Sequence, residues 1–293
     1  MNELEKALLN TESIKIAAAE KPFWYTSGTI GPYFINTHFL IGNEKIANKF
    51  LIFIDKKKDN YKKFIPELID KILKLYKTSA TYRRTIDYLF TIIKTKREFI
   101  NCEYISGGER RDWFFSPIIA HLSNKKILFI YKNLNIYDSN NKITDINGSK
   151  VCHICDLITQ ASSFNRAWIP AIKKINGQLS YVISIVDRDE GGNIFFIKNK
   201  IKYFSFVNID KNFMKNLLNN KIINNDQLKI IQDFKKNIML FGKNYLLKNP
   251  EFLKSSLSDN KTSAKAVRCI NENIYNIDLS KEPFKSLKKY KIK

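Results

Sequence analysis

The stretch Val151-Cys152-His153-Ile154-Cys155-Asp156-Leu157-Ile158-Thr159-Gln160-Ala161-Ser162-Ser163 decides the fold class of this chain. Its first five residues are apolar or semi-polar and have the length of a buried strand. An acid follows at Asp156, then a small hydroxyl-rich segment, and residues 162–175 continue with a helical pattern. The stretch therefore predicts a strand, a loop and a helix in direct succession.

Two explanations fit the polar loop of this stretch. Asp156 is placed to accept hydrogen bonds from vicinal ribose hydroxyls, while Thr159 and the residues up to Ser163 offer backbone N–H and hydroxyl donors to a phosphate. Alternatively, the serines only cap the following helix, which is the commoner role of such residues. Taken alone, the loop favours the capping explanation.

The same strand-and-helix alternation extends on both sides of this stretch. Strands are expected at 102–105, 127–131, 151–155 and 180–186, with helices at 113–122 and 162–175. Two aromatic-rich strands are expected next, at about 194–198 and 201–207. The alternation predicts an α/β fold with a mainly parallel sheet flanked by helices, in which sites form at the carboxyl ends of the strands.

The flanking segments are expected to be mostly helical. A helix is predicted at about 3–20, a hairpin or extended loop at 22–36, and helices at about 44–76 and 79–97. From about 210 to 276 the apolar residues again recur with a helical period. We therefore expect a domain at 1–207, with a hood at about 15–43 and a core at about 61–207, and a helical carboxy-terminal extension at 208–293.

Two more loops follow strands and carry charge. Ser106-Gly107-Gly108-Glu109-Arg110-Arg111-Asp112 combines glycines, which allow close backbone approach, with two arginines suited to a diphosphate. Asp187-Arg188-Asp189-Glu190-Gly191-Gly192 places a guanidinium where it can meet an anionic group on a planar substrate. A turn with solvated charges is the alternative explanation for each.

The formal net charge of +22 raises the question of nucleic acid. The lysines are spread over the whole chain, and the one dense run is the short tail 285–293, so the distribution disfavours a nucleic-acid partner. The first residues lack the basic and apolar regions of a signal peptide, and no apolar run has the length of a membrane helix. We expect a cytoplasmic protein without membrane contact.

The four cysteines do not suggest a disulfide framework. Cys152 and Cys155 have a C-x-x-C spacing, but on a strand residues three apart point to opposite faces and do not share a metal easily. No second Cys/His pair at zinc spacing follows them. We therefore expect no metal held by side chains alone.

Taken in order, the three loops and the aromatic segment resemble the type I phosphoribosyltransferases, and among them orotate phosphoribosyltransferase. Residues 151–162 resemble the phosphoribosyl-pyrophosphate motif of that family. Residues 23–34 resemble its amino-terminal substrate loop, F-x-L-K-S-G-x-x-S-P-Y-F, and residues 186–192 resemble its V-D-R-x-E-G-G turn. The resemblance covers about residues 15–207.

The resemblance implies a transfer of ribose 5-phosphate from phosphoribosyl pyrophosphate to orotate or a related planar base, with Mg²⁺ bound through the donor and Asp156 as the candidate protein ligand. It also implies a homodimer. Catalytic roles fall to Lys132 and Asp156. The implied donor-binding residues are Gly108, Arg110, Arg111, Asp156, Thr159, Gln160, Ala161, Ser162 and Ser163, and the implied base-binding residues are Thr26, Phe34, Thr159 and Arg188.

The chain also departs from the family pattern. Cys155 stands where the motif has its first acid, Ala161 where a glycine is usual, and Thr26 where the substrate loop has a lysine. The segment 132–142 lacks the histidine of the family's catalytic loop, although it keeps two lysines. These departures leave a second hypothesis open, a module on the same fold that senses a nucleotide or phosphoribosyl pyrophosphate without catalysis.

Overall fold

The computed structural model describes residues 1–18 and 20–290, and the chain forms two compact units. The first unit comprises Met1–Ile14 and Asn36–Met214, and the second comprises Lys15–Ile35 and Lys215–Lys293. The division therefore falls after residue 214, later than the boundary expected after residue 207. The segment 15–35, expected as a hood on the core, groups with the carboxy-terminal helices instead.

The first unit is built on a six-stranded sheet with the strand order β10-β9-β8-β5-β6-β7. All neighbouring strands pair in parallel except β7, which is antiparallel to β6. The parallel sheet expected from the alternating pattern is confirmed. Its strands are β5 (Tyr104–Gly108), β6 (Lys126–Ile130), β7 (Ile136–Tyr137), β8 (Lys150–Ile158), β9 (Gln178–Asp187) and β10 (Lys202–Asn208).

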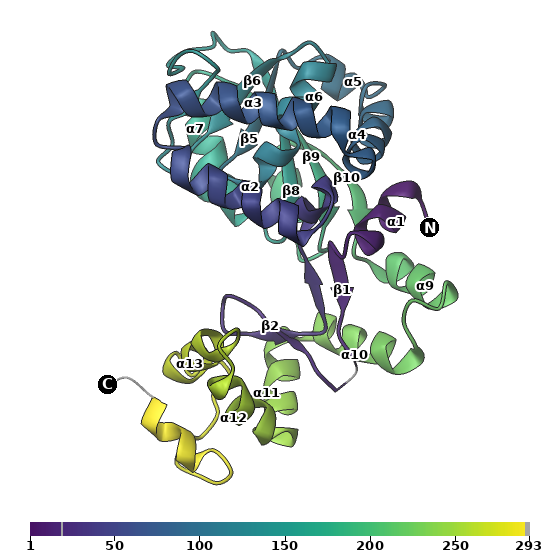
Figure 1. The fold of residues 1–293 in the computed structure, drawn as a ribbon, viewed down its shortest axis with the longest axis vertical. Coiled ribbons are helices and arrows are strands. Elements are labelled where there is room, and N and C mark those ends of the chain that lie inside the picture. The colour runs from purple at the N-terminus through teal and green to yellow at the C-terminus, as the bar shows by residue number, and fades with distance from the viewer. Residues whose placement is uncertain (19, 291–293) are drawn as a thin grey trace. The chain divides into compact units, whose positions relative to one another are not determined.

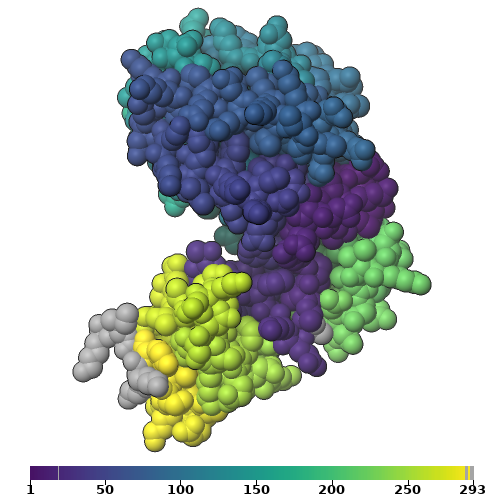
Figure 2. Space-filling model, viewed as in Figure 1, coloured from purple at the N-terminus to yellow at the C-terminus, as the bar shows by residue number. Residues whose placement is uncertain are grey.

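Helices cover this sheet, and Figure 1 shows α2, α3 and α4 together in front of it. Their residues, drawn in blue, make up much of the visible face of the first unit in Figure 2. The helices of this unit are α1 (Glu3–Asn10), η1 (Thr37–Ile41), α2 (Glu44–Lys57), α3 (Tyr61–Thr78), α4 (Ala80–Ile93), α5 (Arg97–Ile100), η2 (Arg111–Phe114), α6 (Ser116–Leu122), η3 (Phe164–Trp168), α7 (Ile169–Lys174) and α8 (Gly192–Lys198). The division between the units falls within α9 (Lys211–Asn219).

The central strand β8 carries the core of this unit and leads into the polar loop. Val151 and Cys155 belong to a buried cluster that includes Phe164, Trp168 and Phe196. Cys152 does not belong to it. Because β8 extends to Ile158, three residues beyond the expected end, the sheet itself positions the first residues of the loop.

Two predicted elements of the first unit are wrong. The expected helix at 3–20 ends at Asn10 and gives way to β1 (Ile14–Ile16). The expected strand at 194–198 is helix α8, where Phe196 is fully buried while Ile194 and Ile197 are 54% and 74% exposed. Because Phe196 inserts into the core while Ile194 and Ile197 face outward, the continuous apolar run does not reveal this packing.

The second unit combines short strands with the carboxy-terminal helices. Trp24 is its anchor, since its ring stacks on Phe252 with centroids 5.6 Å apart and its Nε1 donates to Ser256 Oγ at 2.8 Å. The helical extension and the hairpin expected at 22–36 are present. The elements are β2 (Phe23–Trp24), β3 (Ile30–Gly31), β4 (Tyr33–Ile35), α10 (Asn225–Lys236), α11 (Ile238–Lys248), α12 (Pro250–Ser258), α13 (Ser263–Asn271) and η4 (Lys285–Tyr290).

Candidate phosphate and ribose site

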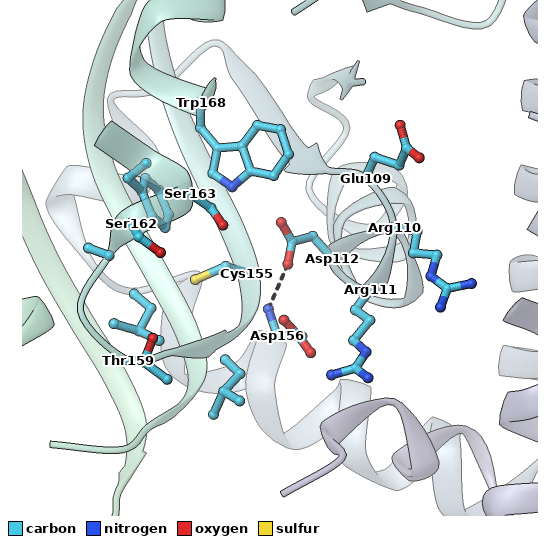
Figure 3. Close-up of a pocket in the computed structure, with 14 residues that line it drawn as sticks. Glu109, Arg110, Arg111, Asp112, Cys155, Asp156, Thr159, Ser162, Ser163 and Trp168 are labelled. Carbon is cyan, nitrogen blue, oxygen red and sulfur yellow. Dashed lines mark hydrogen bonds between the residues drawn. The ribbon is translucent and has the colours of Figure 1, made fainter. Parts of the chain in front are cut away.

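A cavity of about 310 Å³ lies where strands β5 and β8 end in the first unit. It is lined by residues 109–112, 155–159 and 161–164 and by Trp168 (Figure 3). The carboxyl ends of parallel strands are the usual place for a ligand site in a sheet of this kind. The cavity therefore joins two of the three loops singled out in the sequence.

The loop after β8 presents hydroxyl groups to the cavity. Thr159, Ser162 and Ser163 all line it, and Ser163, at the start of η3, makes no capping hydrogen bond with its side chain. Ala161 bends the loop by adopting a left-handed conformation with φ of 56°. The side chain of Ser163 is therefore not used for capping, in contrast to the simpler explanation of the sequence pattern.

A glycine on the neighbouring loop permits this arrangement. A Cβ atom on Gly192 would lie 2.3 Å from Ile158 Cγ2 and 2.8 Å from the carbonyl oxygen of Thr159. Such distances are shorter than carbon atoms tolerate, so a larger residue at this position would displace the loop that follows β8. Gly192 thus supports the shape of the hydroxyl loop.

Asp156 is the buried acid of the cavity and is held at two points. Its backbone N–H donates to Asp112 Oδ1 at 2.9 Å, and its Oδ2 accepts a hydrogen bond from Thr37 Oγ1 at 2.8 Å. Burial and then the charge of Asp112 raise the pKa of Asp156 to about 7, although Arg111 and the Thr37 hydrogen bond oppose this rise. At neutral pH the side chain is therefore poised between its protonated and ionised forms.

The two arginines of the loop after β5 have different partners. Arg110 forms an ion pair with Asp55, whereas Arg111 extends beside Asp156 (Figure 3). Glu109 fixes the loop from outside, because it forms an ion pair with Lys58. Its Oε2 also accepts from the backbone N–H of Lys132 at 3.0 Å. Arg111 is therefore the guanidinium that faces the acid.

The charge of Glu109 is kept by these contacts. Burial alone would raise its pKa, but the hydrogen bonds from Lys58 and from the amide of Lys132, together with their positive charges, hold the pKa below the ordinary value. The peptide bond between Glu109 and Arg110 is cis. Because of its ion pair, Glu109 stays bound at neutral pH to Lys58, which directly follows α2.

The structure brings together seven of the residues expected to bind the donor. These cavity-lining residues are Arg110, Arg111, Asp156, Thr159, Ala161, Ser162 and Ser163. Gln160 and Lys132 lie in the same unit but do not line the cavity. Arg188 also lies outside it, where its N–H donates to the carbonyl of Ile158 at 2.9 Å and its Nε is 3.0 Å from Glu190 Oε1.

Gly108, Thr26 and Phe34 are also outside the cavity lining. The Gly108 N–H donates to Asp112 Oδ2 at 2.8 Å, and a Cβ atom on Gly108 would lie 2.2 Å from the ring of Trp168. Its backbone N–H is therefore engaged inside the protein, and its role in donor binding stays a prediction. Thr26 and Phe34 belong to the second unit, and their assignment to a base stays a prediction.

Three residues of the site were not identified from the sequence: Thr37, Asp112 and Trp168. Asp112 had a signal, since it closes the charged loop after β5, but an acid next to two arginines suggested a solvated surface. Thr37 lies 119 positions before Asp156 and carries no motif, so only the folded chain reveals the contact. Trp168 stands in no motif, and it is both buried and part of the cavity wall.

The donor set of the cavity suits Mg²⁺ only in part. Among the residues that the structure describes, no group of three or more His, Cys, Asp or Glu side chains is arranged to hold a metal ion. Both oxygens of Asp112 and both oxygens of Glu109 already accept hydrogen bonds from nitrogen atoms, which leaves Asp156 as the carboxylate of the cavity lining able to contribute a ligand. A Mg²⁺ ion here would need most of its oxygen ligands from a bound substrate and water.

The fold is that of the type I phosphoribosyltransferases. The UMP synthase of Leishmania donovani superposes with a TM-score of 0.51 at 15% identity, covering 79% of this chain and 41% of that one. Orotate phosphoribosyltransferases of Francisella tularensis and Aeropyrum pernix are similar at 14% and 13% identity, with TM-scores of 0.46 and 0.43. These two matches cover 79% and 73% of this chain and 96% and 98% of theirs.

The comparisons by sequence find no counterpart to this structural likeness. No protein-family model and no curated protein matches the chain. At such low identity the likeness establishes the fold and leaves the substrate open. In the described part of the chain, no helix is long and apolar enough to cross a membrane.

Proposed function

We propose that the cavity binds phosphoribosyl pyrophosphate with Mg²⁺ and transfers its ribose 5-phosphate to orotate or a related planar base. One observation carries the proposal: an acid, a hydroxyl-rich loop and a guanidinium converge in one cavity at the carboxyl ends of β5 and β8. A sugar, a phosphate and a diphosphate need these three kinds of group. The fold adds support, since the UMP synthase with a similar structure is named for a nucleotide product.

Each part of the donor has a counterpart in the proposal. Asp156 accepts hydrogen bonds from the ribose hydroxyls, and the loop from Thr159 to Ser163 binds the 5-phosphate through N–H and O–H groups. Arg111, with Arg110 behind it, faces the diphosphate. In the reaction, a ring nitrogen of the base bonds to ribose C1 while the bond from C1 to the diphosphate oxygen breaks, and pyrophosphate leaves with the electron pair. Mg²⁺ bound to the donor would neutralise charge on this leaving group.

Positioning and charge stabilisation account for most of such a rate enhancement. Asp156 is suited to this task because its ionised form stabilises positive charge that develops on the ribose ring. The pKa near 7 already includes the lowering by Arg111, and a Mg²⁺ ion bound with the donor would favour the ionised form further. Binding of the donor together with Mg²⁺ would therefore be accompanied by loss of a proton from the site.

The base site remains a proposal from the resemblance. Thr26, Phe34 and Arg188 are its proposed residues, together with Thr159, which lines the cavity. Arg188→Ala should weaken the base more than the donor, because the guanidinium is not part of the cavity lining. Equal losses for both ligands would assign Arg188 a structural role instead.

The test is pyrophosphate release from phosphoribosyl pyrophosphate and Mg²⁺ with a panel of bases that includes orotate. Release with one base identifies the activity and the acceptor together. Asp156→Asn should weaken donor binding by about 10- to 100-fold, since a hydrogen bond to a charged group is worth about 1.5–3 kcal/mol. The exposed carboxylate Asp70 on α3 provides the control Asp70→Asn, which should leave the affinity unchanged. Unchanged affinity in Asp156→Asn would refute the site.

A second candidate, a sensor without catalysis, is favoured by the segment 132–148. Its first part forms strand β7 against β6, and Tyr137 stacks on Tyr61 with ring centroids 4.0 Å apart. Its end is tied by the N–H of Gly148 to the carbonyl of Asn176 at 2.7 Å. The segment is thus bound to its own sheet and does not supply Lys132 to the cavity. Saturable donor binding with no pyrophosphate release would support this candidate.

A further inference from the structure

Asp112 connects the two loops of the cavity through a buried hydrogen-bond network. Its Oδ2 accepts from the N–H of Gly108 at 2.8 Å, at the end of β5, and its Oδ1 accepts from the N–H of Asp156 at 2.9 Å, on β8. The third partner is His153, whose Nε2 lies 3.2 Å from Oδ2. The carboxylate of Asp112, which is 6% exposed, therefore fixes the position of the loop after β5 relative to Asp156.

His153 is completely buried and makes hydrogen bonds with both ring nitrogens. Its Nδ1 lies 2.9 Å from Ser106 Oγ, and the two residues are paired in register on the parallel strands β8 and β5. Since Asp112 only accepts, the network assigns the proton to Nε2, so Nδ1 accepts from the Ser106 hydroxyl. Both ring nitrogens of the imidazole then have a hydrogen-bond partner.

The ring of His153 is also fixed by aromatic contacts. It stacks on Trp168 with centroids 6.0 Å apart and an interplanar angle of 23°, and it meets Phe164 edge-on at 4.9 Å. Both aromatic residues line the cavity, whereas His153 and Ser106 do not. The serine is completely buried, so the Ser106, His153 and Asp112 series is no nucleophilic triad despite its order.

We propose that His153 is a positioning residue that fixes the Arg110–Arg111 loop relative to Asp156 by way of Asp112. The reason is that a buried carboxylate needs several donors, and His153 supplies the one side-chain donor to Asp112 in the network. Without it, the carboxylate reorients toward other donors and loosens its hold on the amides of Gly108 and Asp156. The identification of the ligand as a diphosphate attached to a ribose rests on the function proposed above.

Two amide substitutions separate the hydrogen bond to Asp112 from the packing of the ring. The nitrogen of Gln in His153→Gln reaches the place of Nε2 and keeps a donor for Asp112. The shorter amide of His153→Asn reaches only the place of Nδ1, beside Ser106. Both variants lose the aromatic contacts with Trp168 and Phe164, so they are matched for that loss.

The first measurement needs no ligand. Hydrogen exchange of the full chain is followed in peptides that contain Gly108 and in peptides that contain Asp156. His153→Asn should raise exchange in both segments by about tenfold, the effect of losing a charge-assisted hydrogen bond, while His153→Gln should stay close to the unsubstituted protein. Equal exchange in the two variants would overturn the proposal.

The second measurement uses three probes with Mg²⁺: phosphoribosyl pyrophosphate, pyrophosphate alone and ribose 5-phosphate. His153→Asn should weaken the first two about tenfold more than ribose 5-phosphate, and His153→Gln should restore them. An equal loss for all three probes would show a general packing role and contradict the proposal. If the unsubstituted protein binds none of them while exchange still separates the two variants, the proposed function fails and the positioning role of His153 stands.

Discussion

Substitution of Asp156 by asparagine should make the protein more stable, and increasingly so as the pH rises. The pKa of Asp156 is raised from 3.8 to about 7, chiefly by burial. Between these two values the folded chain holds a proton that the unfolded chain has already released. The free energy of unfolding therefore falls as the pH rises from about 4 to about 7, and this loss is absent in Asp156→Asn.

The size of the effect follows from the two pKa values. A shift of about 3 pH units corresponds to an upper limit of about 4 kcal/mol at pH 8, at about 1.4 kcal/mol per unit. Between pH 5 and pH 7 the unsubstituted protein should lose about 2–3 kcal/mol of unfolding free energy because of the raised pKa of Asp156. The stability gap between the variant and the unsubstituted protein should widen by the same amount. The hydrogen bond from Thr37 is kept, since the amide oxygen of asparagine still accepts it.

Urea unfolding at pH 5, 6, 7 and 8 measures this gap directly. Asp70→Asn, which makes the same change on the exposed side of α3, is the control for a general charge effect. A gap that widens for Asp156→Asn and not for Asp70→Asn supports the buried acid. A gap that is constant, or that narrows as the pH rises, would refute the argument that burial dominates the titration of Asp156.

Three further predictions concern the same cavity. Affinity for phosphoribosyl pyrophosphate should rise with pH up to about 7, because the ionised Asp156 is the better acceptor, and titration calorimetry of Asp156→Asn should show this step removed. Arg111→Ala should weaken pyrophosphate by about tenfold or more, whereas Arg110→Ala, whose guanidinium pairs with Asp55, should weaken it less; the reverse order would contradict the assignment. Ala161→Gly should change the unfolding free energy by less than about 1 kcal/mol, because relief of the left-handed backbone offsets the lost methyl group. The control Ala171→Gly, inside α7, should lower the unfolding free energy by about 1–2 kcal/mol. Equal losses for the two alanines in urea unfolding would argue against strain at residue 161.

The network around Asp112 gives Gly107 and Gly108 a role in packing that the sequence did not reveal. A Gly-Gly pair between a strand and two arginines resembles a loop that opens its backbone to a ligand. In the folded chain a Cβ at Gly107 would meet Ser116 Oγ at 2.2 Å, and one at Gly108 would meet Trp168. These glycines are needed for internal packing, and a sequence does not distinguish close approach to a ligand from close approach to a side chain.

The expected strand at 194–198 failed for a related reason. Adjacent aromatic residues raise β-propensity, but Gly191 adopts a φ of 98° and ends the extended backbone before Gly192 begins α8. The side chain of Phe196 then fills the core beside Phe164 and Tyr203. Propensity is a local quantity, and here the gain from burying one ring decides the conformation.

The sequence by itself determined the parallel sheet and the loop that follows β8. Both rest on local order along the chain: an apolar strand, then an acid, then small hydroxyl residues and a helix. Periodicity and turn chemistry act over a few residues, so they can be seen without knowing the fold. Asp156, Thr159, Ser162 and Ser163 were found in this way, and all four line the cavity.

Only the tertiary structure decided which groups surround these residues. Thr37 and Asp112 reach Asp156 from 119 and 44 positions away, and His153 binds Asp112 across 41 positions. Contacts of this kind depend on how the strands are ordered in the sheet, and no local pattern encodes that order. The charge state of Asp156 therefore became visible only once burial and these distant neighbours were known, because both act through space and not along the chain.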